Sequence, residues 1–474
     1  SVHLKEREDR TPSGPRDSAK IDPVRASRDG HQFHEAWAAR SALALLPPDT
    51  NLVAIAMEGF GREDEGTHSQ TATEVADLVR YYGGRSITEA DRIEVVQFKY
   101  SIADADTPVR ASDLRATVAK FAKGEAERIQ RFGAEIAGRA HYEFATNRPV
   151  HPNLFAALAA LAKGSSVTGD TDNQANMIRT ILEEASVDAR AFCGRVTVVG
   201  RLDSLQETRQ GLRREIANWS APGDPQTRIR LLGLEHLMRK KAGSAGQADN
   251  LIERVTVLNE LEIDHEDDLY PTEDAFPEVG AIVVRPLLDD LVANVKAATL
   301  PLVVHAEGGF GKTVLMQALA DRLKASHAVV LFDGFGAGKW REPAHPRHLA
   351  SRTLLHLANV LAARGLCDLL LPSTQEEALL RGFRLRLSEA VAAVRQTDPG
   401  AGVALVLDAI DHAAIAARET GANSFAYLLL KSLSIDPIDG VLAVAPCRTS
   451  RLELTRRDIE TDEFPVPAFS PGET

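Results

Sequence analysis

The sequence predicts an α/β protein made of two structured parts, an N-terminal α/β domain with a helical extension and a C-terminal three-layer α/β domain. Three observations predict this class. Residues 33–133 follow the order helix, strand, strand, strand, helix. An apolar run at 301–305 leads through a glycine-rich loop into a strong helical pattern. From residue 282 onward, strand-like runs alternate with helical patterns, which indicates helices on both faces of one sheet.

The composition is that of a globular protein. Of 474 residues, 44% are hydrophobic and 26% are charged, and 55 Lys and Arg against 67 Asp and Glu give a net charge of −12. This acidity excludes a surface that coats nucleic acid throughout, although one basic groove remains compatible with it. The three cysteines lack disulfide or metal-site spacing, so we expect a cytoplasmic protein. No apolar run approaches the roughly 18 residues that cross a bilayer, so we expect no membrane partner.

The first 29 residues are polar and have no hydrophobic periodicity, which predicts a flexible leader. At the other end, residues 470–474 look like the start of a new helix, and the chain begins with Ser1. We therefore expect a fragment that is cut short before a C-terminal region.

Residues 30–140 are expected to form the first domain. Apolar residues at helical spacing predict a helix over 33–46, which Pro47 and Pro48 end. Strands are predicted at 52–57, 75–82 and 93–100, with a break at Gly83 and Gly84 between the last two. The helix predicted at 114–133 carries more Lys and Arg than Asp and Glu.

The rest of the chain divides into three predicted segments. Residues 141–259 have mostly helical patterns and one β-like run at 195–199, so we expect a helical extension. Residues 260–280 are predicted to be a linker, because eight acidic residues and no Lys or Arg occur between 260 and 274. Residues 281–474 form the second domain, with strands predicted at 302–305, 329–332, 403–407 and 441–445.

Residues 306–313, Ala-Glu-Gly-Gly-Phe-Gly-Lys-Thr, have the pattern of a phosphate-binding loop. The glycines let backbone N–H groups converge on phosphate oxygens at a helix N-terminus. Lys312 can reach the β and γ phosphates, and the Thr313 hydroxyl can bind Mg²⁺. The motif departs from its usual form at Ala306, where a glycine is typical. The predicted nucleotide-binding residues of this segment are Glu307, Gly308, Gly309, Phe310, Gly311, Lys312, Thr313 and Val314.

Three more residues are expected at the same nucleotide. Asp408 ends an apolar strand, where a phosphate-loop protein holds its Mg²⁺ through water. Asp411 follows three residues later and can orient the attacking water, whereas no Glu follows Asp408 directly, which favours a switch over a motor. Arg448 follows the strand at 441–445 and is predicted to reach a γ phosphate.

Residues 282–469 resemble the STAND/NACHT class of signalling ATPases on the strength of these motifs, and residues 333–341 are similar to a segment of antiviral STAND (Avs-like) bacterial proteins. The resemblance implies that the nucleotide is ATP. It also implies assembly into a homo-oligomer on activation. In such proteins a lid and a sensor array follow the nucleotidase, so the implied trigger is a phage protein that acts through a sensor beyond this sequence.

In the first domain, period-two alternation places Gln97 and Lys99 on one face of the strand at 93–100, opposite Phe98. Asp77 begins the preceding strand, and Glu74 is the rival acid three residues earlier. An acid on one strand and Gln-x-Lys on the next resemble the PD-(D/E)xK nuclease superfamily over residues 30–125. The closest similarity is to restriction-endonuclease-like domains at the N-termini of bacterial antiphage effectors.

That resemblance implies roles for the first-domain residues. Asp77 would bind Mg²⁺ with help from Glu35 or Glu58, and Lys99 would position or activate the attacking water. Gln97 stands where the superfamily usually has Glu, which removes one negative ligand.

The sequence thus predicts an antiphage effector in which an ATP-binding STAND switch controls a metal-dependent endonuclease that cuts double-stranded DNA. Three alternatives remain open at this point. The first domain can be a degenerate nuclease fold that binds DNA or a partner within a signalling scaffold. The ATPase can be the motor of a DNA-translocating restriction enzyme. Finally, nucleotide binding can be purely structural.

Overall fold

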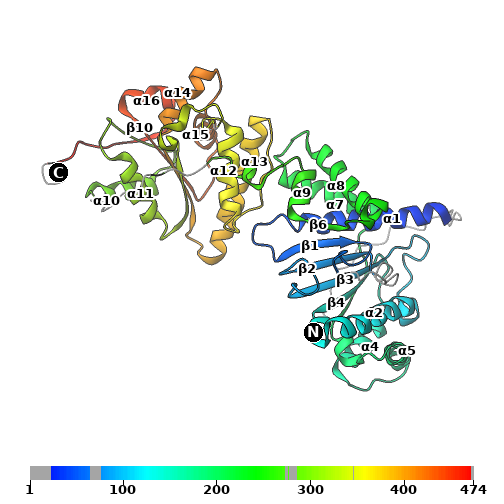
Figure 1. Ribbon diagram of the computed structural model, residues 1–474. Helices are drawn as coiled ribbons and strands as arrows, with labels where there is room; N and C mark the ends of the chain where they lie inside the picture. The colour runs from blue at the N-terminus through cyan, green and yellow to red at the C-terminus, as the bar shows by residue number, and fades with distance from the viewer. Residues whose placement is uncertain (1–22, 65–75, 273–275, 277–284, 345, 471–474) are drawn as a thin grey trace. The chain divides into compact units, whose positions relative to one another are not determined.

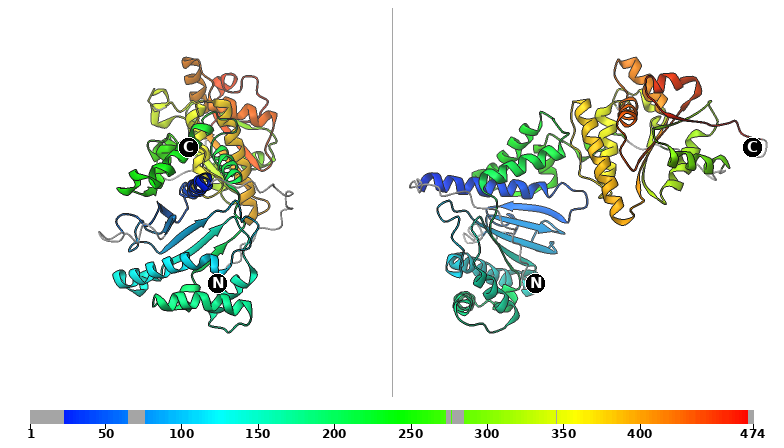
Figure 2. Two further views of the ribbon diagram at one scale, coloured as in Figure 1. Left: turned by 90° about the vertical axis from the view of Figure 1, so that its right-hand side faces the viewer. Right: turned by 180° about the vertical axis from the view of Figure 1, so that it is seen from behind.

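The computed structural model describes residues 23–64, 76–272, 276, 285–344 and 346–470. These residues form two compact units. The first unit takes its described residues from 1–46, 50–214 and 228–262, and the second takes them from 47–49, 215–227 and 263–474. Figures 1 and 2 show a mixed α/β architecture in both units.

The described part of the first unit contains a mixed sheet in the order β5-β4-β3-β2-β1-β6. β1 pairs antiparallel with β2 and β6, and β2 pairs antiparallel with β3. β3 and β4, and then β4 and β5, are parallel. The strands are β1 (Leu52–Met57), β2 (Leu78–Tyr82), β3 (Arg92–Lys99), β4 (Ala140–Thr146), β5 (Val196–Val199) and β6 (Leu251–Glu253).

Helices cover both faces of this sheet (Figure 1). Helix α1 (Pro23–Leu43) lies against one face, where the ring of Phe33 packs edge-on to Phe98 at 6.1 Å. The core on the opposite face contains Val79 and Val95 from the sheet together with Leu114 of α2. Helices on that side are α2 (Ala111–Phe132), α4 (Pro152–Lys163), α5 (Asp170–Glu184) and α6 (Ala189–Cys193). The short α3 (Ala134–Ala137) connects α2 to β4. The remaining helices are α7 (Leu205–Trp219), whose residues from 215 onward belong to the second unit, α8 (Thr227–Ala242) and α9 (Arg254–Glu260).

The second unit is built on a parallel sheet in the order β11-β7-β10-β9-β8. Its strands are β7 (Leu302–Ala306), β8 (His327–Asp333), β9 (Gly402–Asp408), β10 (Val441–Arg448) and β11 (Asp462–Pro465). Because β10 lies between β7 and β9, its carboxyl end lies beside the loop that follows β7. Parallel strands present their carboxyl ends at one edge, which is where open α/β sheets bind ligands.

Two cores flank the parallel sheet, because alternate strand residues point to opposite faces. Val304 and Val406 face α10 (Leu287–Ala297) and α11 (Lys312–Leu323). Val303 and Leu405 face the other layer, which contains α12 (Ala350–Ala362), α13 (Glu376–Thr397), α14 (Ile410–Thr420) and α15 (Phe425–Ile435). The short α16 (Leu452–Arg456) precedes β11.

The structure differs from the sequence prediction in four places. Residues 23–29, expected to be part of a leader, lie within α1. Residues 141–259, expected to be a helical extension, contribute most of β4 and all of β5 and β6 to the same sheet as β1. Within the predicted linker, the described residues include the end of α9 and a 3₁₀ turn at Glu266–Leu269. The strand β11 was not predicted, since Asp-Glu-Phe-Pro has little strand character.

No helix among the described residues is both long enough and apolar enough to cross a membrane.

Candidate functional site

The predicted phosphate loop, residues 306–313, joins the end of β7 to the start of α11. Gly309 and Gly311 have φ values of +84° and +72°, in the left-handed region that glycine adopts without strain. A Cβ added at Gly308 or Gly309 would meet no atom within 4 Å, so the rim of the loop is open. The first turn of α11 follows Gly311 directly and directs its unpaired N–H groups toward this loop.

Lys312 lies across the loop. Its Nζ donates to the backbone oxygens of Ala306 at 2.9 Å and Glu307 at 2.8 Å. Burial lowers the pKa of Lys312, and the negative charge of Asp411 opposes that shift. The ammonium group is thus held at the place where phosphate oxygens would meet it, and the residues present fit a bound nucleoside triphosphate.

Asp408 and Thr313 meet beside the loop. Asp408 ends β9 and its side chain is buried, which raises the pKa of the carboxyl group to about 6. The Thr313 hydroxyl opposes that rise as a hydrogen-bond donor. The Oδ1 atom of Asp408 accepts a bond of 2.9 Å from the N–H of Ala409, which has a left-handed φ of +54°. A hydroxyl and a carboxylate placed this way suit Mg²⁺, which takes oxygen ligands and keeps several waters.

Asp411 lies in the first turn of α14 and pairs with a residue that the sequence analysis missed. The Nη1 atom of Arg451 lies 3.0 Å from Oδ2 of Asp411, and Nδ1 of His412 lies 3.4 Å from Oδ1. Burial alone would raise the pKa of Asp411, but His412 and Arg451 outweigh it and hold the pKa below its usual value. Asp411 is therefore a carboxylate near neutral pH.

Arg448 ends β10 and is exposed. It pairs in register with Ala306 at the start of the phosphate loop, and its charge contributes to the lowered pKa of Lys312. The sequence-predicted nucleotide residues therefore lie together at one edge of the sheet. The segment at 333–341 begins beside them, where Asp333 is in register with Asp408. The Asp333 carboxylate accepts from the N–H groups of Phe335 and Gly336 at 2.8 and 3.0 Å, so its visible role is to shape this turn.

A second cluster occurs in the first unit, at one end of the mixed sheet. His34 of α1, Glu58 after β1 and Asp77 before β2 each offer a ligand atom, and these atoms lie within 4.8 Å of one another. His34 Nδ1 is 3.8 Å from Asp77 Oδ1. Glu58 has a left-handed φ of +51°, a conformation that non-glycine residues seldom adopt and that is common at functional sites.

The carboxylate of Asp77 is fixed by β3. Its Oδ2 accepts from Nε2 of Gln97 at 2.6 Å and from the backbone N–H of Phe98 at 2.6 Å. The Phe98 ring, on the other face of the strand, packs against the His34 ring at 5.5 Å. In this arrangement Gln97 acts as a donor that orients Asp77.

Burial dominates the electrostatics of the cluster. It raises the pKa of Asp77 to about 6, against the bonds from Phe98 and Gln97. It raises the pKa of Glu58 to about 7, and the nearby charge of Asp77 adds to the rise. The pKa of His34 is lowered to about 4 by burial and by His31. Burial is the largest cause for all three groups and disfavours their charged forms, and a bound cation would offset this effect at the two carboxylates. The donor set fits a divalent cation.

The other predicted residues of the first unit lie differently. Glu35 points away from the cluster toward α8, with Oε2 3.7 Å from Nε of Arg239. The side chain of Lys99 is exposed at the end of β3 and makes no hydrogen bond or ion pair with another described residue. Lys120 of α2 was not predicted, but its charge acts on Asp77. Glu74 lies outside the described residues.

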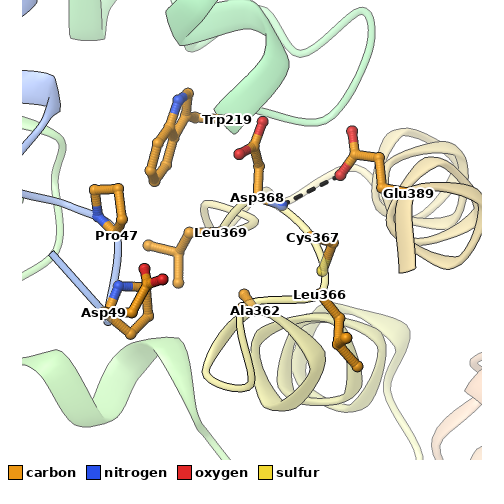
Figure 3. Close-up of a pocket in the computed structure, with 11 residues that line it drawn as sticks. Pro47, Asp49, Trp219, Ala362, Leu366, Cys367, Asp368, Leu369 and Glu389 are labelled. Atoms are coloured by element: carbon orange, nitrogen blue, oxygen red, sulfur yellow. Dashed lines mark hydrogen bonds between the residues drawn. The ribbon is translucent and has the colours of Figure 1, made fainter. Parts of the chain in front are cut away.

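A cavity of about 400 Å³ lies in the second unit, away from the phosphate loop (Figure 3). Trp219 and Cys367 line it, and Glu389 accepts a bond of 3.2 Å from the N–H of Asp368. Burial raises the pKa of Cys367 to about 12, so its thiol is neutral near pH 7 and a poor nucleophile.

Comparisons with known proteins identify no family. No protein-family model matches the chain, and no curated protein matches its sequence. Among solved structures, a Cap4 receptor with a SAVED/CARF domain from Moraxella osloensis is 9% identical, with a TM-score of 0.29 over 82% of this chain and 68% of that chain. The corresponding Acinetobacter baumannii receptor is 8% identical, with a TM-score of 0.27 over 82% and 67%. The structure of an Acinetobacter baumannii receptor with the cyclic trinucleotide 3'3'3'-cAAA is 9% identical to this chain, with a TM-score of 0.28 over 83% of this chain and 66% of that chain. Likeness at this level carries no argument about the fold or activity of this chain.

Proposed function

We propose that the second unit binds ATP with Mg²⁺ and acts as a switch, and that it controls a metal-dependent endonuclease for double-stranded DNA formed by the first unit. The observation that carries the nuclease assignment is the convergence of Glu58 and Asp77 at one end of the sheet, with Gln97 fixing Asp77. Hydrolysis of a phosphodiester requires positive charge next to the phosphoryl oxygens, and two carboxylates are the groups that hold such a cation.

Each residue of the first-unit site has a separate role in the proposed cleavage. A bound cation would supply Lewis-acid activation of the phosphate. Asp77 and Glu58 hold it, and the bonds from Gln97 and Phe98 stop the Asp77 carboxylate from turning away. Lys99 lies exposed at the end of the same strand and is assigned to the water or the scissile phosphate. Basic residues of α2, Lys120 among them, are assigned to phosphates of the DNA backbone.

The residues of the second unit recognise the nucleotide. Lys312 and the loop N–H groups bind the phosphates, and Thr313 and Asp408 hold Mg²⁺. Asp411 accepts a hydrogen bond from the attacking water. A role in phage defence, with a phage protein as trigger and a homo-oligomer as the active form, rests on the sequence resemblance to antiviral STAND proteins.

The nuclease assignment is tested on the full chain with linear double-stranded DNA, Mn²⁺ or Mg²⁺, and ATP. Cleavage is measured on gels and DNA binding by fluorescence anisotropy. Asp77→Ala and Lys99→Ala should each abolish cleavage while leaving ATP binding unchanged. Lys163→Ala, which removes an exposed lysine in the last turn of α4, is the control and should still cut. Cleavage that survives both Asp77→Ala and Lys99→Ala would overturn the assignment.

One observation favours a second candidate function. Gln97 replaces a carboxylate and already donates its amide to Asp77, which leaves the site with fewer negative ligands than two acids and a Glu would provide. A small number of negative ligands is what we expect of a degenerate nuclease fold that binds DNA or a protein partner. DNA binding by wild type in the same assay, with no cleavage under any metal, would favour this function.

A further inference from the structure

The ring of His34 lies beside the two carboxylates of the first-unit cluster. The ligand atoms of His34, Glu58 and Asp77 lie within 4.8 Å of one another. Around an octahedral ion bound at about 2.1 Å, neighbouring ligand atoms are about 3 Å apart and opposite ones about 4.2 Å apart. Small side-chain rotations therefore bring the three groups onto one cation.

Both His34 and Glu58 are available for this role. Among the described residues, neither the His34 ring nor the Glu58 carboxylate takes part in a hydrogen bond. The Oδ2 atom of Asp77 accepts hydrogen bonds from Gln97 and Phe98, while its Oδ1 lies 3.8 Å from Nδ1 of His34. Polar groups removed from solvent usually have a partner, so the ring of His34 and the carboxylate of Glu58, beside the free Oδ1 of Asp77, are suited to share a cation.

The second observation is that the ring is held in place. Phe98 packs against it at 5.5 Å with the rings 33° apart, and Phe33 packs against it at 6.4 Å. Phe98 also donates its N–H to Asp77, so one residue of β3 fixes both prospective ligands. Rigid support of this kind is what a metal site needs around its ligands.

We propose that His34 ligates the metal and that the first unit therefore selects a divalent transition metal such as Mn²⁺ over Mg²⁺; this rests on the nuclease function proposed above. Mg²⁺ takes oxygen ligands almost without exception, whereas first-row transition metals accept imidazole nitrogen readily. One nitrogen and two carboxylates on one side of an ion leave positions open for water and a phosphate oxygen.

The test uses the full chain in two measurements. Calorimetric titrations with MnCl₂ and with MgCl₂ compare wild type with His34→Gln, His31→Gln and Asp77→Asn. His31 lies one turn earlier on α1 and is not one of the three clustered residues, so it is the control for a neighbouring imidazole. Pulsed electron paramagnetic resonance of bound Mn²⁺ then detects a directly bonded imidazole through its nitrogen coupling.

Wild type should bind Mn²⁺ roughly tenfold or more tightly than Mg²⁺ at this site, and its spectrum should show nitrogen coupling. His34→Gln should lose the coupling and about tenfold in Mn²⁺ affinity, with its Mg²⁺ affinity nearly unchanged. His31→Gln should keep the nitrogen coupling of wild type, because its imidazole is not a ligand.

The outcomes separate this inference from the function beneath it. If wild type binds Mn²⁺ at an Asp77-dependent site without nitrogen coupling, His34 is not a ligand, whereas the two-carboxylate nuclease site stands. If Asp77→Asn binds Mn²⁺ as wild type does, the cluster is not a metal site, and both the ligand role of His34 and the nuclease assignment are wrong. Should His34→Gln fail to fold, the wild-type spectrum decides alone.

Discussion

The guanidinium of Arg451 lies 3.0 Å from the carboxylate of Asp411, whose side chain is only 3% exposed. This pair links the turn after β10 to the first turn of α14, which follows β9, at the carboxyl edge of the sheet. With Arg451 and His412 beside it, Asp411 keeps its negative charge despite burial. A charged acceptor next to a phosphate loop is suited to orienting water.

Replacing Asp411 by Asn should slow ATP hydrolysis roughly 100-fold, because an amide is a much weaker acceptor for the proton of the attacking water. ATP affinity should stay within about threefold of wild type, since the lost interaction belongs to the transition state. Phosphate release and calorimetry measure the two effects. Glu460→Gln, at an exposed acid, should change neither. Loss of binding together with hydrolysis would show that Asp411 is structural.

Lys312→Ala should weaken ATP binding at least tenfold and abolish it at micromolar nucleotide. A charge-assisted hydrogen bond to phosphate contributes on the order of 1.5 to 3 kcal/mol. Lys324→Ala, which removes an exposed lysine just beyond the end of the same helix, is the control. Isothermal titration of both variants checks the prediction, and unchanged affinity in Lys312→Ala would remove the nucleotide assignment.

Asp408 should make the second unit less stable as pH rises. Its carboxyl pKa is about 6 when folded, compared with an ordinary value of 3.8, so the unfolded chain releases this proton first. Below pH 4 the protonated carboxyl group of Asp408 stabilises the folded state. This contribution, about 3 kcal/mol, is lost as pH rises from 4 toward 6. Asp408→Asn should lack this loss. Hydrogen exchange of the β9 amides at pH 4 and pH 7 measures the difference, and parallel behaviour of variant and wild type would contradict it.

Gln97→Glu should have opposite effects with and without metal. Without metal, a donor 2.6 Å from Asp77 is exchanged for a second negative charge, which should destabilise the first unit by about 2 kcal/mol. With Mn²⁺ or Mg²⁺, the added carboxylate should tighten binding roughly tenfold. Thermal unfolding with and without each metal measures both effects. A variant that is destabilised equally in either condition would argue against a cation at this cluster.

The sequence sufficed for the phosphate loop because its residues are consecutive and its chemistry follows from a local strand-loop-helix order. Lys312 and Thr313 need no distant information to be placed. Asp408 followed from its position at the end of an apolar strand. Arg451 could not be predicted, because its pairing with Asp411 depends on how two separate loops meet.

The first-unit cluster was predicted only in part, because three distant segments build it. Gln97 was found by strand periodicity, and Asp77 was found because it begins the preceding apolar strand. Glu35 was chosen for its carboxylate, but neighbouring helix residues point about 100° apart, so it is His34 that faces the cluster. The strands at 140–146 and 251–253 were hidden among helical patterns, although Tyr142 and Phe144 do alternate with polar residues.

The connection between β2 and β3 determines more than the path of the chain. Leu78 is in register with Val96, and this alignment is what brings Gln97 and the Phe98 N–H to Asp77. Inserting or deleting one residue between 83 and 91 would shift the pairing and exchange the two faces of β3. There is little slack to absorb such a change, because a Cβ at Gly84 would lie 2.6 Å from Glu89. The geometry around Asp77 thus constrains the length of the β2–β3 connection, although none of the proposed metal ligands lies in that connection.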